Sequence, residues 1–488
     1  MTKKQSRRAK TTRRLGVTGL ASAGLVFASF GPGALGQQNP GNNAQIAGFF
    51  ASVDLVNSLQ FTDDDGRAST DVRLNITSQT RNQRLTFQTG TGIDIPLSDD
   101  GEIRSERPVL RFEFVRDNGA TEVSSLLSYR RVPVDGFVPT DVDDTGFGAV
   151  TVIDEDTGDE IVSGDFDEQD LVRDEGDRED ISFGLSLEFA KRRSVGFGIE
   201  VAHQQRNFID IDDPDLFDTM STDYTAFARF TINPRVTARL NYNYDLSESD
   251  GESERERTSE RLGGSVSWRA SPLLSFSGSL SSADVETTLN DGAGGRVTET
   301  EEGVDYSASL RYRRPNGSIT ASASRSINSN GAVDEYSVGR SLAFRNGSLT
   351  ANAGVSTFDD GESFPSFGLS YGRQTKRGRI SVAARQFAGT TSEDLDAIFS
   401  SVTASYRENL TATSSVTFTA GYNTSNVVDS FETDRQSTRF GLTYRQDVTR
   451  DWDLAAGYQY REARRGGDGA GNSNRVFINL ERTFQVRP

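Results

Sequence analysis

The feature that most constrains this 488-residue chain is an alternation of apolar and polar residues in segments of about ten, each followed by a turn. One such segment contains Ile181, Phe183, Leu185, Leu187 and Phe189, with polar or small residues between them. Successive side chains of a strand lie on opposite faces, so a period of two predicts a strand with one apolar and one polar face. About ten residues of a strand tilted by about 45° also cross the hydrocarbon core of a bilayer.

The connections between these segments alternate between two kinds. Ten short turns and eleven longer, mostly acidic connections predict 22 strands, uncertain by two, with both termini on one side. Outer-membrane barrels have this asymmetry, with short periplasmic turns and long extracellular loops. The predicted fold class is therefore all-β, a closed antiparallel transmembrane β-barrel. Besides 132–180, the predicted external loops include those near 62–69, 91–107, 206–221, 247–257 and 286–301.

Aromatic residues gather at one end of the segments. Nine of the ten segments that enter a short turn end in an aromatic residue of the apolar phase, and arginine or lysine follows almost every one. Aromatic rings favour the headgroup boundary, so rings at one depth predict a girdle around the barrel. The predicted girdle consists of Phe114, Phe189, Phe230, Trp268, Tyr312, Phe344, Tyr371, Tyr406 and Tyr444.

The first residues of the chain differ from the rest. Seven lysines and arginines without an acid precede the apolar run Leu15–Phe30, and Ala34–Gly36 offers small residues to a signal peptidase. This order is typical of a cleavable secretory signal. The predicted divisions are a signal peptide at 1–36, a short periplasmic segment at 37–50 and the transmembrane barrel at 51–488.

Charge and composition exclude several functions. Without the seven cations of the signal, 46 basic residues face 71 acidic ones, a net charge near −25, so we expect no nucleic-acid binding. The chain has no cysteine, which excludes disulfides and thiolate metal sites. His203 is the only histidine, and it continues an apolar phase with no serine or carboxylate arranged to serve it. We therefore expect no catalytic residue, no cofactor and no enzyme.

The hairpins have a recognisable style. One runs from Phe440 through Leu442 and Tyr444 to a turn and returns through Trp452 and Tyr458. In this respect the chain resembles bacterial outer-membrane porin-like barrels, particularly uncharacterised β-barrel porin families. The resemblance implies the outer membrane of a Gram-negative bacterium. It also implies outer-membrane lipid, lipopolysaccharide, the barrel assembly machinery and hydrophilic solutes as partners.

The polar phase of the strands predicts a lumen wall with charges of both signs among small polar residues. Such a wall suits water and hydrophilic solutes. The same charges are also explained if they simply pair across strands, as any polar barrel interior requires, and both interpretations stay open for each residue. The predicted pore-lining residues are Arg73, Arg111, Glu113, Arg229, Arg239, Arg311, Arg439 and Arg461.

The segment 132–180 is much longer than the other connections and carries 18 acids against two arginines. It contains a predicted hairpin, Ala149 to Ile153 and Glu160 to Ser163. One hypothesis folds this loop into the lumen, where its carboxylates meet inward arginines and form a constriction; the alternative leaves it outside in solvent. Its carboxylates also suit Ca²⁺, although they lack EF-hand spacing and a solvated acidic run explains them as well. The weak calcium candidates are Asp154, Asp156, Asp159, Asp165, Asp167 and Asp170.

These features predict an outer-membrane channel for passive passage of hydrophilic solutes or ions. Two alternatives stay open: an export conduit for a polymer such as an exopolysaccharide, and an adhesin or envelope scaffold with a closed lumen. We do not expect a plugged TonB-dependent importer, because only about 14 residues separate the signal from the first strand. The oligomeric state is also open. Arg340 falls in the lipid phase, which a bulge near Gly339 or a subunit contact in a homo-oligomer would accommodate.

Overall fold

The computed structural model describes twelve stretches of the chain: residues 48–62, 66–97, 104–133, 149–153, 160–164, 176–211, 216–251, 254–290, 295–390, 395–428, 434–465 and 471–486. These residues form strands and turns and no helix. The predicted signal peptide at 1–36 lies outside them. The strands are β1 (Gly48–Thr62), β2 (Gly66–Gln79), β3 (Gln83–Pro96), β4 (Arg104–Asp117), β5 (Thr121–Pro133), β6 (Ala149–Ile153), β7 (Glu160–Gly164), β8 (Asp177–Phe189), β9 (Val195–Ile209), β10 (Thr219–Asn233), β11 (Val236–Asp250), β12 (Glu254–Arg269), β13 (Leu274–Asn290), β14 (Arg296–Arg314), β15 (Gly317–Asn328), β16 (Gly331–Phe344), β17 (Gly347–Thr357), β18 (Ser363–Gln374), β19 (Gly378–Thr390), β20 (Asp396–Asn409), β21 (Ser414–Val427), β22 (Arg435–Asp447), β23 (Trp452–Arg465) and β24 (Gly471–Val486).

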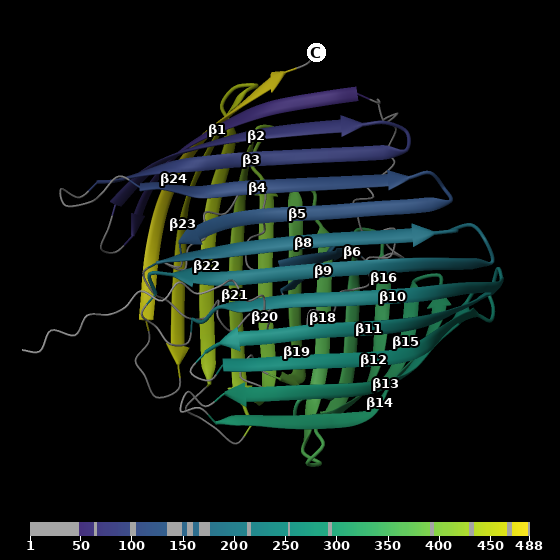
Figure 1. The fold of residues 1–488 in the computed structure, drawn as a ribbon. Helices are drawn as coiled ribbons and strands as arrows, with labels where there is room; N and C mark the ends of the chain where they lie inside the picture. The colour runs from purple at the N-terminus through teal and green to yellow at the C-terminus, as the bar shows by residue number, and fades with distance from the viewer. Residues whose placement is uncertain are drawn as a thin grey trace, which may run out of the picture.

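Twenty-two of these strands close into one antiparallel barrel (Figure 1). Each strand pairs with the next along the chain, β5 pairs with β8, and β1 closes the ring by pairing with β24 from Ala51↔Val486 to Thr62↔Arg475. The predicted fold class and strand number are confirmed. The remaining strands, β6 and β7, form a separate hairpin at the predicted place.

The strands are longer than a bilayer requires, and this corrects the predicted loops. The strands of the barrel reach 19 residues in β14, and only 251–253 remain between β11 and β12, where a loop near 247–257 was expected. The predicted loop near 62–69 shrinks in the same way to 63–65. Backbone hydrogen bonds hold two antiparallel strands together, so the strands can continue beyond the lipid without an apolar face. A polar strand of this kind has no period-two hydrophobic signal, and the sequence therefore reads as loop.

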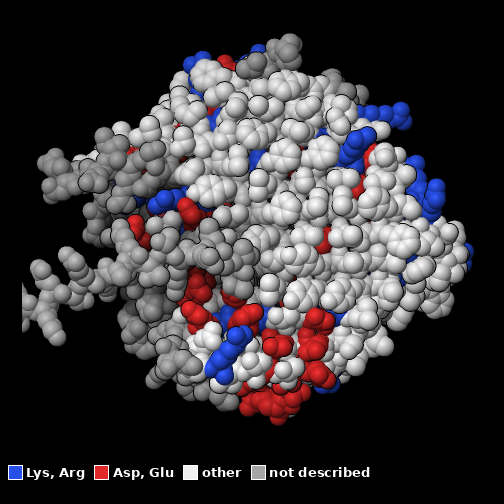
Figure 2. Space-filling model, in the orientation of Figure 1, with Lys and Arg blue, Asp and Glu red and all other residues white. Residues whose placement is uncertain are grey.

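The outer face of the barrel is apolar and exposed. On neighbouring strands, Leu240 is 52% exposed, Leu262 57% and Leu280 61%. Figure 2 shows this wall as a broad uncharged band, with acidic residues toward its loop end and basic residues toward its turn end. A closed barrel with such an exterior leaves no unpaired sheet edge and presents its apolar side chains to lipid. The fold and its exterior define an outer-membrane β-barrel, as predicted.

The short turns are built by their own side chains. In the β4–β5 turn the Asn118 Oδ1 accepts hydrogen bonds from the backbone N–H of Ala120 at 3.0 Å and of Thr121 at 2.7 Å. Gly119 between them has a φ of +79°, which an L side chain rarely adopts. An Asn-Gly pair therefore fixes the short reversal that the barrel needs at this end.

Candidate functional site

The lumen wall is the inward phase of the barrel strands, opposite to the exposed apolar residues. All eight predicted pore-lining residues lie in this phase, because each alternates with outward apolar neighbours such as Phe112 and Phe114 beside Glu113. They differ in exposure. Arg461 is buried, Arg111 and Arg311 are exposed, and Arg73, Glu113, Arg229, Arg239 and Arg439 are half-buried.

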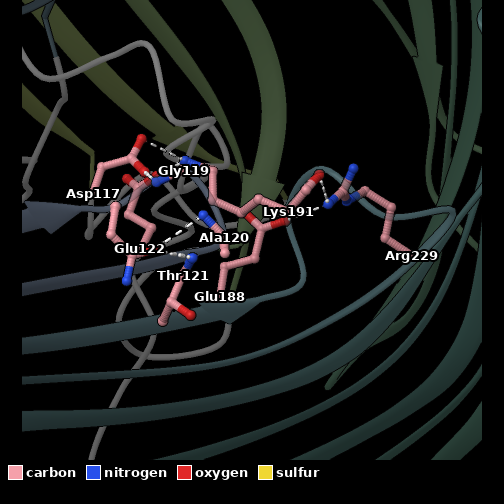
Figure 3. A network of polar contacts seen from close by, with 9 residues as sticks. Asp117, Gly119, Ala120, Thr121, Glu122, Glu188, Lys191 and Arg229 are labelled. Carbon is pink, nitrogen blue, oxygen red and sulfur yellow. Dashed lines mark hydrogen bonds and ion pairs between the residues drawn. The ribbon is translucent and has the colours of Figure 1, made fainter.

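Near the turn end of the lumen, charges pair across strands and turns (Figure 3). The Nη2 of Arg229 lies 2.8 Å from Glu188 Oε1 and donates to the Lys191 carbonyl at 2.7 Å. Lys191 in the β8–β9 turn pairs with Glu122 and, at 3.0 Å, with Asp117. Burial opposes the Lys191 charge, but the hydrogen bonds to Glu122 and Asp117 outweigh it and raise the pKa of Lys191. This network holds two turns together.

Arg239 faces Arg229 directly across β10 and β11, an arrangement of like charges that needs compensation. Its Nη2 lies 3.8 Å from Glu200 Oε1, and its Cζ lies 3.7 Å from the centre of the Phe227 ring. Carboxylate and ring face both stabilise the guanidinium. The two arginines therefore belong to one fixed charge network of the wall.

Further up the lumen, the tip of the β15–β16 hairpin leaves the wall and tilts inward. The pairing of β14 with β15 ends at Tyr306↔Arg325, whereas β15 continues with β16 to Asn328↔Gly331. Beyond that point Ile327 packs with Ala283, Val285 and Ala332 in a buried cluster. Because Ala283 and Val285 lie in the inward phase of β13, the hairpin tip covers part of the inner wall.

A polar clamp holds this tip. The Arg261 Nε lies 2.8 Å from Asp305 Oδ2, and its Nη1 lies 3.0 Å from Asp245 Oδ2. Arg261 and Asp305 also bond to the tip itself. Arg261 Nη2 donates to the Ile327 carbonyl at 3.0 Å, and Asp305 Oδ1 accepts from the Ile327 N–H at 2.7 Å. Side chains of β12 and β14 thus fix one residue of the hairpin, and Asp245 of β11 supports Arg261. Arg261 is not among the pore-lining residues predicted from the sequence.

The β6–β7 hairpin reaches the far wall. It is inserted between β5 and β8, yet β7 contacts β19, eleven strands from β8 in a ring of 22. Figure 1 shows β6 within the ring of strands. Of the two interpretations of 132–180, entry into the lumen is therefore the one that the hairpin supports. The calcium candidates Asp154–Asp159 and Asp165–Asp170 lie outside the described residues.

The inner wall near β19 is apolar, against the pattern of the polar phase. Phe387 of β19 stacks on Phe399 of β20 with ring centres 5.2 Å apart, and Phe399 is 7% exposed. Ala397 beside them is fully buried, and Arg385 Cζ lies 4.6 Å from the Phe387 ring centre. Inward side chains of a wide barrel are exposed to water unless another segment of the polypeptide covers them. The burial of these residues therefore indicates that this part of the lumen is filled.

Two further parts of the inner wall, which we call the arginine wall and the serine wall, differ in the solvent exposure of their side chains. Three of the four residues of the arginine wall, on β22 to β24, are buried: Arg435 and Arg475 are each 5% exposed and Arg461 3%, while Arg439 is half-buried. The serine wall, on β13 to β15, is more open, and Ser277, Ser279 and Ser307 are exposed. The arginine wall consists of Arg435, Arg439, Arg461 and Arg475. The serine wall consists of Ser277, Ser279, Ser281, Ser307, Ser309, Ser322 and Ser324.

The girdle residues lie on the outward phase at the turn ends of their strands. Six are among the exposed large side chains of the barrel, and Phe344 stacks on Tyr371 with ring centres 6.2 Å apart. The Tyr406 hydroxyl donates to Glu408 and the Tyr444 hydroxyl to Gln446, each at 2.8 Å. The six exposed girdle residues are Phe189, Phe230, Trp268, Tyr312, Phe344 and Tyr406.

Two unusual outward residues also find partners. Arg340 is in the lipid phase, and its Nη2 donates to Asn316 Oδ1 in the β14–β15 turn at 3.0 Å. A guanidinium that reaches down to the interface avoids the hydrocarbon, so neither a bulge nor a subunit contact is needed to place it. His203, on the lipid side of β9, lies 2.9 Å from Thr222 Oγ1 through its Nδ1.

No known protein-family description and no curated protein sequence matches this chain. Solved structures match in fold. The ferric-catecholate import receptor Fiu from E. coli K12, in its open form, has a TM-score of 0.56 at 10% identity, over 89% of this chain and 81% of Fiu. The FrpB iron transporter from Neisseria meningitidis (F5-1 variant) has 0.56 at 9% identity, over 89% and 82%. The ferric preacinetobactin receptor BauA from Acinetobacter baumannii has 0.53 at 9% identity, over 90% and 80%.

These similar structures are receptors and transporters of outer-membrane barrel fold. The sequence pattern had instead suggested porin-like families. At about one residue in ten identical, the likeness shows the fold alone.

Proposed function

We propose that this protein is an outer-membrane channel for passive passage of hydrophilic solutes, narrowed by the β6–β7 hairpin. The observation that carries the proposal is the contrast between an open, hydroxyl-lined wall and a filled one. Exposed Ser277, Ser279 and Ser307 offer a polar path, while β7 lies against β19. Twenty-two strands enclose a lumen roughly 40 Å across between backbones, at ~4.8 Å per strand and ~40° tilt. A single hairpin narrows such a lumen without closing it.

The hairpin is the element to test. Purified protein in planar bilayers is compared with a variant that lacks 149–164 and with one in which a Gly/Ser segment of equal length replaces it. We expect the wild type to conduct and the deletion to raise single-channel conductance at least about twofold, since pore conductance follows the open cross-section. The equal-length replacement separates the folded hairpin from the bulk of its chain. Absence of conductance from the wild type and both variants contradicts the channel and favours a scaffold with a closed lumen.

A second candidate is uptake of a ferric chelate, because Fiu is an import receptor for a ferric catecholate and BauA is a receptor for ferric preacinetobactin. The fold likeness and the strand number favour it. Uptake of labelled ferric siderophore by iron-starved cells, with and without collapse of the proton gradient, distinguishes the two functions. A passive channel admits small neutral solutes at a rate that follows their own concentration gradient. This rate does not change when the proton gradient is collapsed.

Export of a polymer is the third function compatible with a polar lumen. It differs from passive diffusion in requiring a secreted chain to cross the barrel. Loss of an extracellular polysaccharide on gene deletion, restored by the wild type but not by a variant with a blocked lumen, would favour export over diffusion.

A further inference from the structure

The serine wall contains a cavity. Passive diffusion through the proposed channel does not require a cavity of this kind. It has a volume of about 300 Å³ and lies on the inner face between β11 and β15. Its polar lining includes two amides and four serine hydroxyls, together with one carboxylate, Asp305, and one guanidinium, Arg325. The amides and hydroxyls belong to Asn241, Asn243, Ser279, Ser281, Ser307 and Ser324.

The charges at this cavity are already compensated within the protein. Both oxygens of Asp305 are engaged, one by Arg261 at 2.8 Å and the other by the Ile327 N–H at 2.7 Å. Arg325 at the opposite side lies 3.3 Å from Asp334. A charged ligand therefore meets no uncompensated partner among these residues. What the cavity presents to a ligand is neutral.

The neutral groups all have two roles. A serine hydroxyl donates one hydrogen bond and accepts others, and an asparagine side chain both donates and accepts. Ser279 and Ser307 share one hydrogen bond at 2.6 Å, and Asn243 Oδ1 accepts from Thr225 at 3.0 Å, which leaves the Asn243 amide N–H groups for a ligand. Groups with both roles suit a ligand whose own groups have both roles, and that is a polyhydroxylated molecule.

The backbone makes room for such a ligand. Gly263 lies on the inner face directly between Asn241 and Ser281. A Cβ at Gly263 would come within 2.3 Å of the Ser281 Cβ, so a side chain is excluded there and the wall stays hollow. Below the hollow, serines face each other across strands, as Ser277↔Ser309 and Ser309↔Ser322. The hydroxyl surface therefore continues down the wall from the cavity.

From this geometry we propose that the cavity binds neutral carbohydrate, with Asn241, Asn243 and the serines as its hydrogen-bonding partners. The inference rests on the proposed function, because it names the class of solute for which the channel provides a wall site. Neutral oligosaccharides are distinguished from other hydrophilic solutes by the number of hydroxyls that they offer to a row of serines. Binding occurs on the open side of the lumen, away from the β19 wall that the hairpin contacts.

Maltohexaose is the probe, and poly(ethylene glycol) of equal hydrodynamic size is the control because it has almost no hydroxyl donors. We expect maltohexaose to interrupt the single-channel current about tenfold longer than the polymer. The double variant Ser279→Ala/Ser307→Ala should shorten these interruptions about tenfold. The matched control is Ser381→Ala/Ser405→Ala, a second hydroxyl pair, 3.3 Å apart, on β19 and β20.

Equal interruptions by the two probes, or equal effects of the two double variants, overturn the carbohydrate site. Calorimetric titration of the detergent-solubilised barrel with maltohexaose keeps this outcome separate from that of the proposed function. Binding that the first double variant weakens, in a protein that does not conduct, supports the site and rejects the channel. Conductance without binding does the reverse.

Discussion

The serine wall and the arginine wall lie in one lumen, nine strands apart at β14 and β23 in a ring of 22, and they have opposite relations to water. Serines, which are small and neutral, stay exposed, whereas the long charged side chains of Arg461 and Arg475 are 3% and 5% exposed. A polar phase is expected on both walls, so polarity does not set this difference. What differs is whether another segment of the polypeptide covers the wall.

This difference indicates that the open path through the barrel lies off the barrel axis, on the side of the serine wall. Arg439 and Arg461 are directly opposite each other on β22 and β23, and like charges at that spacing destabilise a sheet in water. Such a pair, with Arg461 buried and Arg439 half-buried, is tolerated only where other groups of the protein compensate the two charges. The arginine wall is therefore an anchoring surface, and the serine wall borders the path of solutes.

Thiol labelling gives the largest effect that this comparison predicts. The chain has no cysteine, so Ser277→Cys and Ser437→Cys each introduce one thiol, at an exposed position and at a fully buried one. We expect a hydrophilic thiol reagent to label position 437 on the order of 100-fold more slowly, the ratio for a local opening of roughly 3 kcal/mol. Labelling is measured by mass shift over time. Both positions should react alike after unfolding in detergent and heat, and similar rates in the folded barrel would remove the distinction between the walls.

Removal of the Arg261 clamp comes next in size. Arg261→Ala deletes two ion pairs and a hydrogen bond to Ile327 around a side chain that is only 26% exposed. We expect a loss of about 2–3 kcal/mol of stability, since the carboxylates of Asp245 and Asp305 lose their cation in a half-buried place. Hydrogen exchange at Ile327 should also accelerate, because the hairpin tip is released toward the lumen.

The control for this variant is Arg296→Ala. Arg296 lies 3.5 Å from Glu256, with side chains 63% and 41% exposed, so its loss should cost less than about 1 kcal/mol. Urea unfolding of both variants compares the two. Equal losses, or an unchanged hairpin tip in Arg261→Ala, would show that the tip is held by the apolar cluster alone.

Much of the fold could be predicted from the sequence because the membrane imposes a period. Alternation such as Val236 to Leu246, together with aromatics before the short turns, determined the phase of each strand and the closure of the barrel. The upper parts of the strands were missed for the converse reason. Glu248, Glu256 and Thr288 lie side by side in the outward phase of β11, β12 and β13, where no lipid requires an apolar residue, and the sequence pattern placed them in loops.

The filling of the lumen was predicted only in part. The acidic loop and its hairpin stood out by length and pattern, but Arg261 and Ile327 are 66 positions apart and nothing local joins them. A signal was nevertheless present. Val285 and Phe387 are large apolar residues in a phase that is otherwise polar, and such breaks occur where chain covers the inner wall. Reading the inward phase for apolar exceptions would have found both covered places.

The smallest expected effect concerns the turn end of the wall, where the comparison is between two lysines in short turns. Lys191 pairs with Glu122 and Asp117, whereas Lys376 is exposed in the β18–β19 turn. Lys191→Gln should cost about 1 kcal/mol at neutral pH and Lys376→Gln close to nothing. Because the pairing raises the folded pKa of Lys191 above the ordinary 10.5, its stabilisation is complete below that pH and lost as pH rises through the raised value. Thermal melting as a function of pH should therefore separate the wild type from Lys191→Gln at pH 8, and the gap should shrink as the pH rises above 10.5. A gap that persists at high pH would mean that the lysine stabilises the turn by packing and not by charge.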